Sequence, residues 1–350
     1  MIAALLAGPA GAEVLRVATW SAELSRKGPG LLWRDIESGK DKQIAAAIEV
    51  ITATAPDILL ITGFDWDFEG RALAAFEARL AAAGQGYPYR FAPPTNAGLA
   101  TGLDLDGNGR LGEGRDAQGY GRFTGQGGMA LLSRLPIETE RARDFSTLAW
   151  RDLPGALIEG AGLSPEARAV QRLSTVAHWD LPLRRADGSA LHLLAFAATP
   201  PVFDGPEDRN GRRNHDEAAF WRLYLDGRLG EAPPAPPFVV LGDANLDPAD
   251  GEGRPEALTA LLADPRLQDP RPASAGGAAA ADPGQKGDPA LDTADYPDPP
   301  GNLRVDYVLP SAGLRIEGAG VYWPAPGAPG AAAAETASRH RLVWVDLAFP

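Results

Sequence analysis

Short apolar runs recur along the whole chain, and each has the length and composition of a buried β-strand. Regular helical spacing of apolar side chains occurs in fewer segments, at residues 42–55, 69–83, 214–225 and 255–262. The strand-like runs lie at residues 14–20, 57–62, 129–133, 174–183, 191–197, 238–241, 305–309 and 342–347. Because strands dominate the middle and the end while helices punctuate them, we predict an α/β fold of two mostly antiparallel sheets packed face to face, with helices outside.

The chain shows no clear boundary between domains. Residues 231–237 and 273–302 are rich in Pro, Gly and Ala and lack periodicity, so we expect both to be surface loops. Each lies between strands of the same presumed core. A length of 350 residues suits one large α/β unit, and we predict a single domain over residues 13–350.

The composition restricts the chemistry that the chain can perform. It contains no cysteine, which excludes thiolate metal sites, a cysteine nucleophile and disulfides, so a bound metal must use oxygen and imidazole ligands. The net charge of −13 argues against broad electrostatic capture of nucleic acid. It leaves room for a metal-assisted site for phosphate esters, and we expect a monomer.

The first twelve residues are uncharged and mostly small or apolar, and they end in Ala10-Gly11-Ala12, a pattern typical of a secretory cleavage site. The basic region that normally opens such a signal is missing. Two interpretations stay open: a truncated signal peptide of a secreted or periplasmic protein, or an Ala-rich leader of a cytoplasmic one. No stretch has the ~20 apolar residues that a membrane span needs, so we expect no membrane partner.

Three strand ends carry polar side chains that suit an active site. Asp243 and Asn245 follow the run at 238–241, Asp306 lies within the run at 305–309, and His340 precedes the last run. Each has an ordinary alternative, namely a turn cap, a solvated strand face or a surface imidazole. The occurrence of these three motifs together and in this order along the chain favours a catalytic set.

With these residues in place, the chain resembles the endonuclease/exonuclease/phosphatase superfamily, the deoxyribonuclease I-like metallophosphoesterases. The resemblance spans nearly the whole chain. It rests on LRVATW at 15–20, PDILLI at 56–61, GMALLSRLPI at 128–137, GDAN at 242–245, VDYVL at 305–309 and SRH at 338–340. Within the superfamily, residues 199–210 resemble an uncharacterised bacterial branch.

This resemblance implies a four-layer α/β sandwich with its active site at one end of the two sheets. It also implies one or two divalent ions, Mg²⁺ or Mn²⁺, that assist in-line attack of water on a phosphate ester. In such a site His340 takes a proton from the attacking water and Asp306 holds its tautomer. Asp243 orients that water or a metal, and Asn245 donates to a phosphate oxygen.

Several positions depart from the family pattern. Ser21 stands where family members usually have Asn, Gly63 where they have Glu, Ala197 where they have His, and Arg339 where they have Asp. Loss of the Glu or the His costs ~10²–10⁴-fold in rate if nothing substitutes, so Gly63→Glu with Ala197→His is expected to raise activity. Asp65 is a candidate replacement metal ligand, although a loop Asp after a strand explains it as well.

These departures support a rival function, a degenerate member that binds a phosphorylated ligand or a protein partner without turnover. The substrate itself stays open among nucleic acid, inositol phosphate, phospholipid head group and small phosphate ester. The acidic balance shifts the weight from DNA toward small substrates.

A basic patch in this acidic chain is a candidate phosphate contact. Arg212, Arg213, Asn214 and His215 lie where a loop enters a helix, and both Arg side chains and helix N-termini suit phosphate oxygens. A solvated helix cap explains the same residues equally well.

Residues 104–116 match the start of an EF-hand-type calcium loop. Asp104, Asp106 and Asn108 offer oxygen ligands at alternating positions around a turn glycine. The twelfth position holds Arg115 where a bidentate Glu is expected, with Glu113 and Asp116 beside it. We predict a structural Ca²⁺ here, and a metal-free turn is the alternative.

Overall fold

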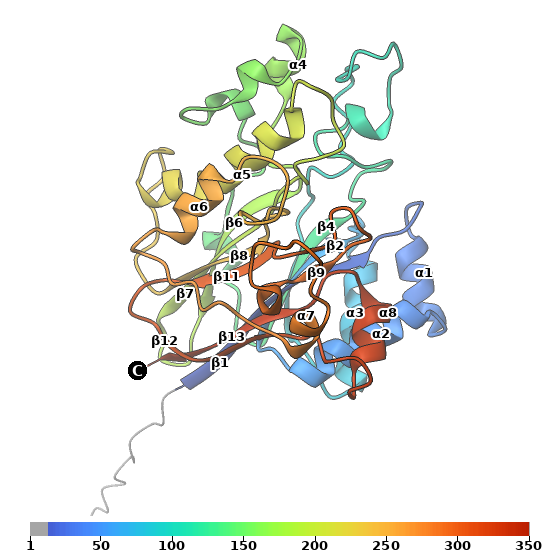
Figure 1. Cartoon of the computed structure of the whole chain (residues 1–350), viewed down its shortest axis with the longest axis vertical. Coiled ribbons are helices and arrows are strands. Elements are labelled where there is room, and N and C mark those ends of the chain that lie inside the picture. The colour runs from blue at the N-terminus through green and yellow to red at the C-terminus, as the bar shows by residue number, and fades with distance from the viewer. Residues whose placement is uncertain (1–12, 350) are drawn as a thin grey trace, which may run out of the picture.

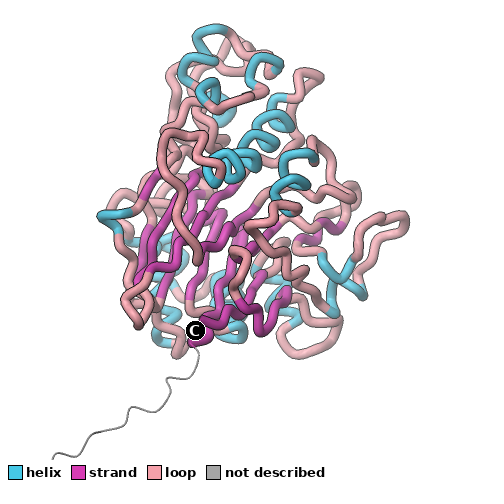
Figure 2. The backbone as a smooth tube through the Cα atoms, turned by 90° about the vertical axis from the view of Figure 1, so that its left-hand side faces the viewer, coloured by secondary structure: helices cyan, strands magenta, loops and turns pink. Residues whose placement is uncertain are grey.

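The computed structural model describes residues 13–349. The candidate leader at residues 1–12 therefore lies outside the described part of the chain. Two sheets form the centre of the molecule, and Figure 1 shows helices α1, α2, α3 and α8 on one side of them and α5 and α6 on the other. Figure 2 shows the strands gathered between these helical layers.

The first sheet has six strands in the order β12-β13-β1-β2-β4-β3, and the second has five in the order β11-β8-β7-β6-β5. Neighbouring strands are antiparallel except for the parallel pairs β1 with β2 and β7 with β8. The first sheet comprises β1 (Glu13–Leu24), β2 (Ile58–Phe64), β3 (Tyr89–Phe91), β4 (Gly128–Ser133), β12 (Arg315–Val321) and β13 (Val343–Phe349). The second comprises β5 (Arg143–Asp144), β6 (Ala177–Arg184), β7 (Ala190–Ala197), β8 (Phe238–Asp243) and β11 (Asp306–Pro310). A separate two-stranded ribbon consists of β9 (Ala294–Asp295) and β10 (Asn302–Leu303).

Three apolar clusters hold the layers together because alternate side chains of a strand point to opposite faces of its sheet. Val17 and Leu60 from the first sheet meet Leu193 and Val239 from the second in the cluster between the sheets. Two further clusters join the outer face of each sheet to its helices. This is the predicted sandwich, with both sheets mixed and mostly antiparallel.

Helices cover the outer faces. They are α1 (Leu31–Ser38), α2 (Lys42–Thr54), α3 (Arg71–Ala82), α4 (Pro165–Val170), α5 (Arg209–Leu225), α6 (Glu256–Leu262), α7 (Ala275–Ala279) and α8 (Ala331–Ala337). Short 3₁₀ turns occur at Gly114–Asp116, Thr139–Arg141, Trp150–Asp152, Ile158–Gly160 and Pro289–Leu291. The helical segments expected from periodicity correspond to α2, α3, α5 and α6. The helices α1, α4, α7 and α8 and the strand β12 were not predicted from the sequence. Among the described residues, no helix has the length and apolar character that crossing a membrane requires.

Candidate active site

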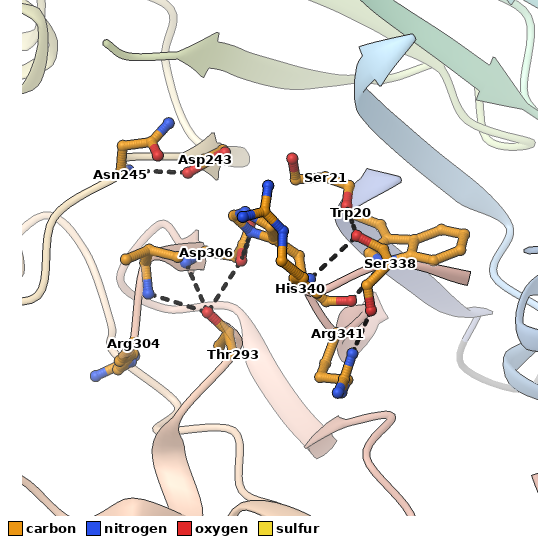
Figure 3. A network of polar contacts seen from close by, with 12 residues as sticks. Trp20, Ser21, Asp243, Asn245, Thr293, Arg304, Asp306, Ser338, His340 and Arg341 are labelled. Atoms are coloured by element: carbon orange, nitrogen blue, oxygen red, sulfur yellow. Dashed lines mark hydrogen bonds and ion pairs between the residues drawn. The ribbon is translucent and has the colours of Figure 1, made fainter. Parts of the chain in front are cut away.

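The site is built around two buried carboxylates on neighbouring strands. Asp243 ends β8, Asp306 begins β11, and the two residues are direct partners in the antiparallel register. Both are almost fully buried, at 5% and 1% exposure. Figure 3 shows the two side chains facing the same region as His340 and Ser21. The strand ends therefore bring together residues that lie far apart in the sequence.

His340 is tied to this pair through Asp306. Its Nδ1 lies 2.9 Å from Asp306 Oδ2, so Nδ1 carries a proton and donates it to the carboxylate. Thr293 supports the same oxygen by donating from Oγ1 at 3.0 Å, and it accepts the backbone N–H groups of Val305 and Asp306. The predicted juxtaposition of Asp306 and His340 is present in the fold.

The electrostatics of the cluster follow from burial and from like charges. Burial, together with the neighbouring charge of Asp306, raises the pKa of Asp243 to about 7. Burial acts in the opposite direction on His340, but the charges of Asp306 and Asp243 and the hydrogen bond to Asp306 outweigh it and raise the pKa of His340 to about 9. The pair of carboxylates thus favours a positive charge in its vicinity.

A divalent cation fits this cluster. Asp243, Asp306 and His340 offer ligand atoms within 4.8 Å of one another. Asp306 Oδ1 is buried and has no hydrogen-bond partner within residues 13–349, which is costly for a carboxylate oxygen unless a cation or water satisfies it. Oxygen ligands of this kind suit Mg²⁺ or Mn²⁺.

Asp65 does not belong to this group of ligand atoms. Its carboxylate accepts the backbone N–H groups of Arg26 at 2.7 Å and Gly127 at 2.9 Å, and so it organises the loops that follow β1 and precede β4. Burial raises its pKa despite these bonds. The proposed substitution of Asp65 for the missing family carboxylate is therefore revised, because its oxygens are committed to local backbone.

The GDAN turn at residues 242–245 is held in place by its own hydrogen bonds and by a side chain of α5. Asn245 has a positive φ of 50°, its backbone N–H donates to Asp243 Oδ1 at 2.8 Å, and its side chain donates to Ala198 O at 2.9 Å. Asn214, fully buried in α5, donates to Thr199 O and to Ala244 O. One helix side chain thereby clamps the ends of β7 and β8 together.

A cavity of about 1080 Å³ opens beside Asp243 and Asn245. Its wall includes Ser21 and Gly63 from the first sheet and Ala197 from the second. The other lining residues include Asp106, Arg115, Tyr120, Thr199, Phe203, Asp204, Glu207, Arg209, Asn210 and Arg213. The cavity therefore mixes acidic, basic and aromatic groups.

The side chains of the basic patch on α5 mostly form hydrogen bonds within the protein. Arg213 is buried and donates to the backbone carbonyls of Leu173, Gln118 and Ser174, although it borders the cavity. Arg212 donates to Glu207 O, and His215 pairs with Asp216. The predicted substrate contacts by Arg212 and His215 are revised, because both side chains are bonded within the protein. The predicted contact by Asn214 is revised as well, because its amide joins the ends of two strands.

Arg209 and Asn210, earlier on the same helix, border the cavity instead.

Two of the departures from the family pattern, Ser21 and Gly63, lie where both central strands of the first sheet are irregular. The register shifts between Ser21 and Leu24 on β1 and between Thr62 and Phe64 on β2. The extra residues include Glu23, whose carboxylate accepts Arg339 Nε at 2.9 Å and the Arg339 backbone N–H at 2.8 Å. An arginine and glutamate pair thus stands beside His340.

Tyr296 is the main site residue that sequence reasoning missed. Its hydroxyl lies 2.8 Å from His340 Nε2, and its ring meets the imidazole edge-on at 5.5 Å. Burial and the charges of Asp243 and Asp306 raise the pKa of Tyr296 above its usual value. Tyr296 lies in the aperiodic Pro-rich segment, which carries no local signal for a site residue.

The α/β sandwich carries a buried cluster of two Asp and one His at its strand ends, and comparison with known proteins shows the family to which the chain belongs. A sequence model described as the endonuclease/exonuclease/phosphatase family matches residues 33–340. This chain belongs to that family. No curated protein sequence matches it.

Several solved structures share the fold. An endonuclease/exonuclease/phosphatase from Beutenbergia cavernae is 18% identical with a TM-score of 0.56, covering 96% of this chain and 72% of that one. A family protein from Leptotrichia buccalis is 12% identical with a TM-score of 0.52 over 96% and 100% of the two chains. Sphingomyelinase C from Streptomyces griseocarneus is 17% identical with a TM-score of 0.50 over 95% and 99%. At these identities the likeness establishes the fold.

Gly63 bears on how the family carboxylate can be restored. Its φ is +66°, and a Cβ there would lie 3.3 Å from the backbone nitrogen of Glu23. The expectation that Gly63→Glu simply restores the missing group is therefore corrected, because any side chain meets both strain and a backbone contact. Ala197 is the better position, since it pairs with Asp243 and lines the cavity.

We predict that Gly63→Ala destabilises the protein more than Gly70→Ala does. Gly70 has nearly the same φ, +64°, but a Cβ there meets nothing within 4 Å. Both changes lose about 1–2 kcal/mol to the left-handed backbone, and only Gly63→Ala adds the contact with Glu23. Denaturant unfolding measures the free energy of unfolding of both variants. Equal losses would contradict the prediction and show that the backbone at Glu23 moves away without cost.

Proposed function

We propose that this chain is a divalent-metal-dependent phosphoesterase that acts on a small phosphate ester. The observation that carries the proposal is the convergence of Asp243, Asp306 and His340 in one buried cluster, of which Asp243 lines the cavity. A buried acid pair joined to an imidazole is suited to move a proton beside a polyanionic substrate. Membership of the family supports the same reaction class.

Each residue has a role that its contacts support. His340 takes the proton of the attacking water at Nε2, and Asp306 keeps the other nitrogen protonated and fixes the ring. Asp243, at the end of the cavity, orients that water. Asn245 uses one side-chain N–H on Ala198 and retains a second N–H for a phosphate oxygen.

Asp243 and the free oxygen of Asp306 would hold the Mg²⁺ or Mn²⁺ ion. When bound, such an ion polarises the phosphoryl oxygen and offsets the negative charge that keeps His340 protonated.

The cavity supports a small substrate over a nucleic-acid duplex. Its lining combines Arg115, Arg209 and Arg213 with Asp106, Asp204, Glu207 and Asp243, so it lacks the excess of basic groups that a phosphate backbone favours. The net charge of −13 acts in the same direction.

A second candidate function is ligand binding without turnover. It is favoured by the commitment of Asp65 to backbone amides. It is also favoured by Arg339, which stands where family members usually have Asp and pairs with Glu23. It predicts that a phosphate ester binds measurably while no hydrolysis follows.

We expect slow, metal-dependent hydrolysis of bis(p-nitrophenyl) phosphate or p-nitrophenyl phosphate, abolished by chelator. His340→Ala should lower kcat by ~10²-fold or more because it removes the base. His192→Gln is the control, since His192 pairs with Asp180 on β6, and its rate should stay at the wild-type value. Binding of either ester by calorimetry without hydrolysis under Mg²⁺, Mn²⁺ or Ca²⁺ would favour the binding function.

We further propose a structural Ca²⁺ in the loop at residues 104–116. Asp104, Asp106 and Asp116 offer oxygens within 4.8 Å of one another. Unlike Asp65, which has no such acidic neighbours in a cluster within residues 13–349, Asp104 and Asp116 lie in one even though both also accept backbone N–H groups of the loop. Asn108 instead donates its side chain to Asp106 and Glu113.

Calcium should raise the melting temperature by several degrees relative to EGTA, because a ligand that binds only the folded state stabilises it by mass action. Asp106→Ala should abolish that calcium-dependent shift. Scanning calorimetry measures both, and identical melting in calcium and EGTA would leave the loop as a metal-free turn.

A further inference from the structure

Both nitrogens of the proposed base are already bonded within the protein. His340 Nδ1 is held by Asp306 Oδ2 at 2.9 Å, and Nε2 is held by the hydroxyl of Tyr296 at 2.8 Å. The tyrosine ring lies edge-on to the imidazole with an interplanar angle of 87°. A water or phosphate oxygen that approaches Nε2 must take the place of this hydroxyl, because an imidazole nitrogen makes one such bond at a time.

The shape of the cavity agrees with this contact. Asp243 and Asn245 line it, whereas His340, Asp306 and Tyr296 are not among its lining residues. His340 is only 5% exposed. Asp243 is thus open to the cavity, whereas Asp306 and the base His340 are closed off from it.

Tyr296 begins the largely exposed loop that connects β9 to β10. Backbone bonds join Thr293 and Asp295 to the strand-like stretch 339–341, and Tyr296 is the first residue beyond the last of them. Residues 297–300 are exposed. The ribbon's apolar anchor is a small separate cluster of Ala294, Leu303 and Val305, with Tyr296 packed against it. Segments with few buried contacts open locally at a lower cost than global unfolding.

Tyr296 makes a second contact, through its aromatic ring, with Arg339. The Arg339 guanidinium lies 5.4 Å from the centre of its ring, and Glu23 fixes that guanidinium from the first sheet. Arg339 stands where family members usually have an acidic residue, so this departure contributes a contact that keeps Tyr296 over the imidazole.

We propose that Tyr296 is a displaceable cap on His340, and that its hydroxyl marks the position of the reacting oxygen. This inference rests on the proposed function. Substrate enters productively only when the turn at residues 296–301 has moved away and exposed Nε2 to the cavity. The apparent activity is then reduced by the fraction of molecules in which the cap is closed.

Two substitutions test the cap through activity. Tyr296→Phe keeps the ring and its contact with Arg339 but removes the hydrogen bond, so kcat/KM should rise about 2- to 10-fold. Tyr296→Ala removes the ring as well and should raise it further. Tyr89→Phe, on the exposed strand β3, is the matched control and should leave the rate unchanged. A fall of 10-fold or more in Tyr296→Phe would overturn the cap, because the hydroxyl would then be required for the chemistry.

A second readout does not depend on turnover. Acylation of His340 by diethylpyrocarbonate, followed by peptide mass spectrometry, should be several-fold faster in both Tyr296 variants than in the wild type and Tyr89→Phe. Faster acylation without hydrolysis in any variant would retain the cap and refute the proposed function. Unchanged acylation of His340 in Tyr296→Ala would refute the cap itself.

Discussion

The arrangement of this site depends on one constraint, the placement of two buried carboxylates opposite each other on neighbouring strands. Asp243 and Asp306 are register partners, and like charges in a buried place repel unless a positive group compensates them. His340 meets part of that demand through its bond to Asp306. Asp306 Oδ1 has no hydrogen-bond partner among the described residues, and we propose that a cation meets the remainder. The helix α5 and Thr293 serve this arrangement by fixing the strand ends and one carboxylate oxygen.

The side of the site formed by β1 and β2 differs in backbone structure from the regular strands that the family pattern implies. The departures from that pattern must therefore be considered together with the local backbone. The bulges in β1 and β2 place Glu23 near His340 and put Gly63 in a left-handed conformation that disfavours a side chain. Arg339 pairs with Glu23 and lies over the ring of Tyr296. Substitutions that look independent in the sequence are therefore joined by contacts, and restoring one group alone does not recreate the usual site.

Periodicity predicted two packed sheets, and the strand-end motifs together with the family resemblance predicted the meeting of Asp243, Asn245, Asp306 and His340. These features depend on local patterns, because a strand end places its next residues at the sheet edge. Tyr296 and Glu23 could not be found in this way. Tyr296 reaches His340 through pairing of residues 293–295 with 339–341, and Glu23 owes its position to a bulge. Asp65 failed as a predicted ligand because the loops around it supply amides that no pattern reveals.

The central claim, that Asp243 and Asp306 form a divalent-cation site, is tested most directly by Mn²⁺ binding followed by electron paramagnetic resonance. The measurement uses Asp106→Ala as background, so that the loop at residues 104–116 does not contribute. The account predicts a Mn²⁺ site in this background that is lost when Asp243→Asn is added. Mn²⁺ binding of equal affinity with and without Asp243→Asn would contradict it.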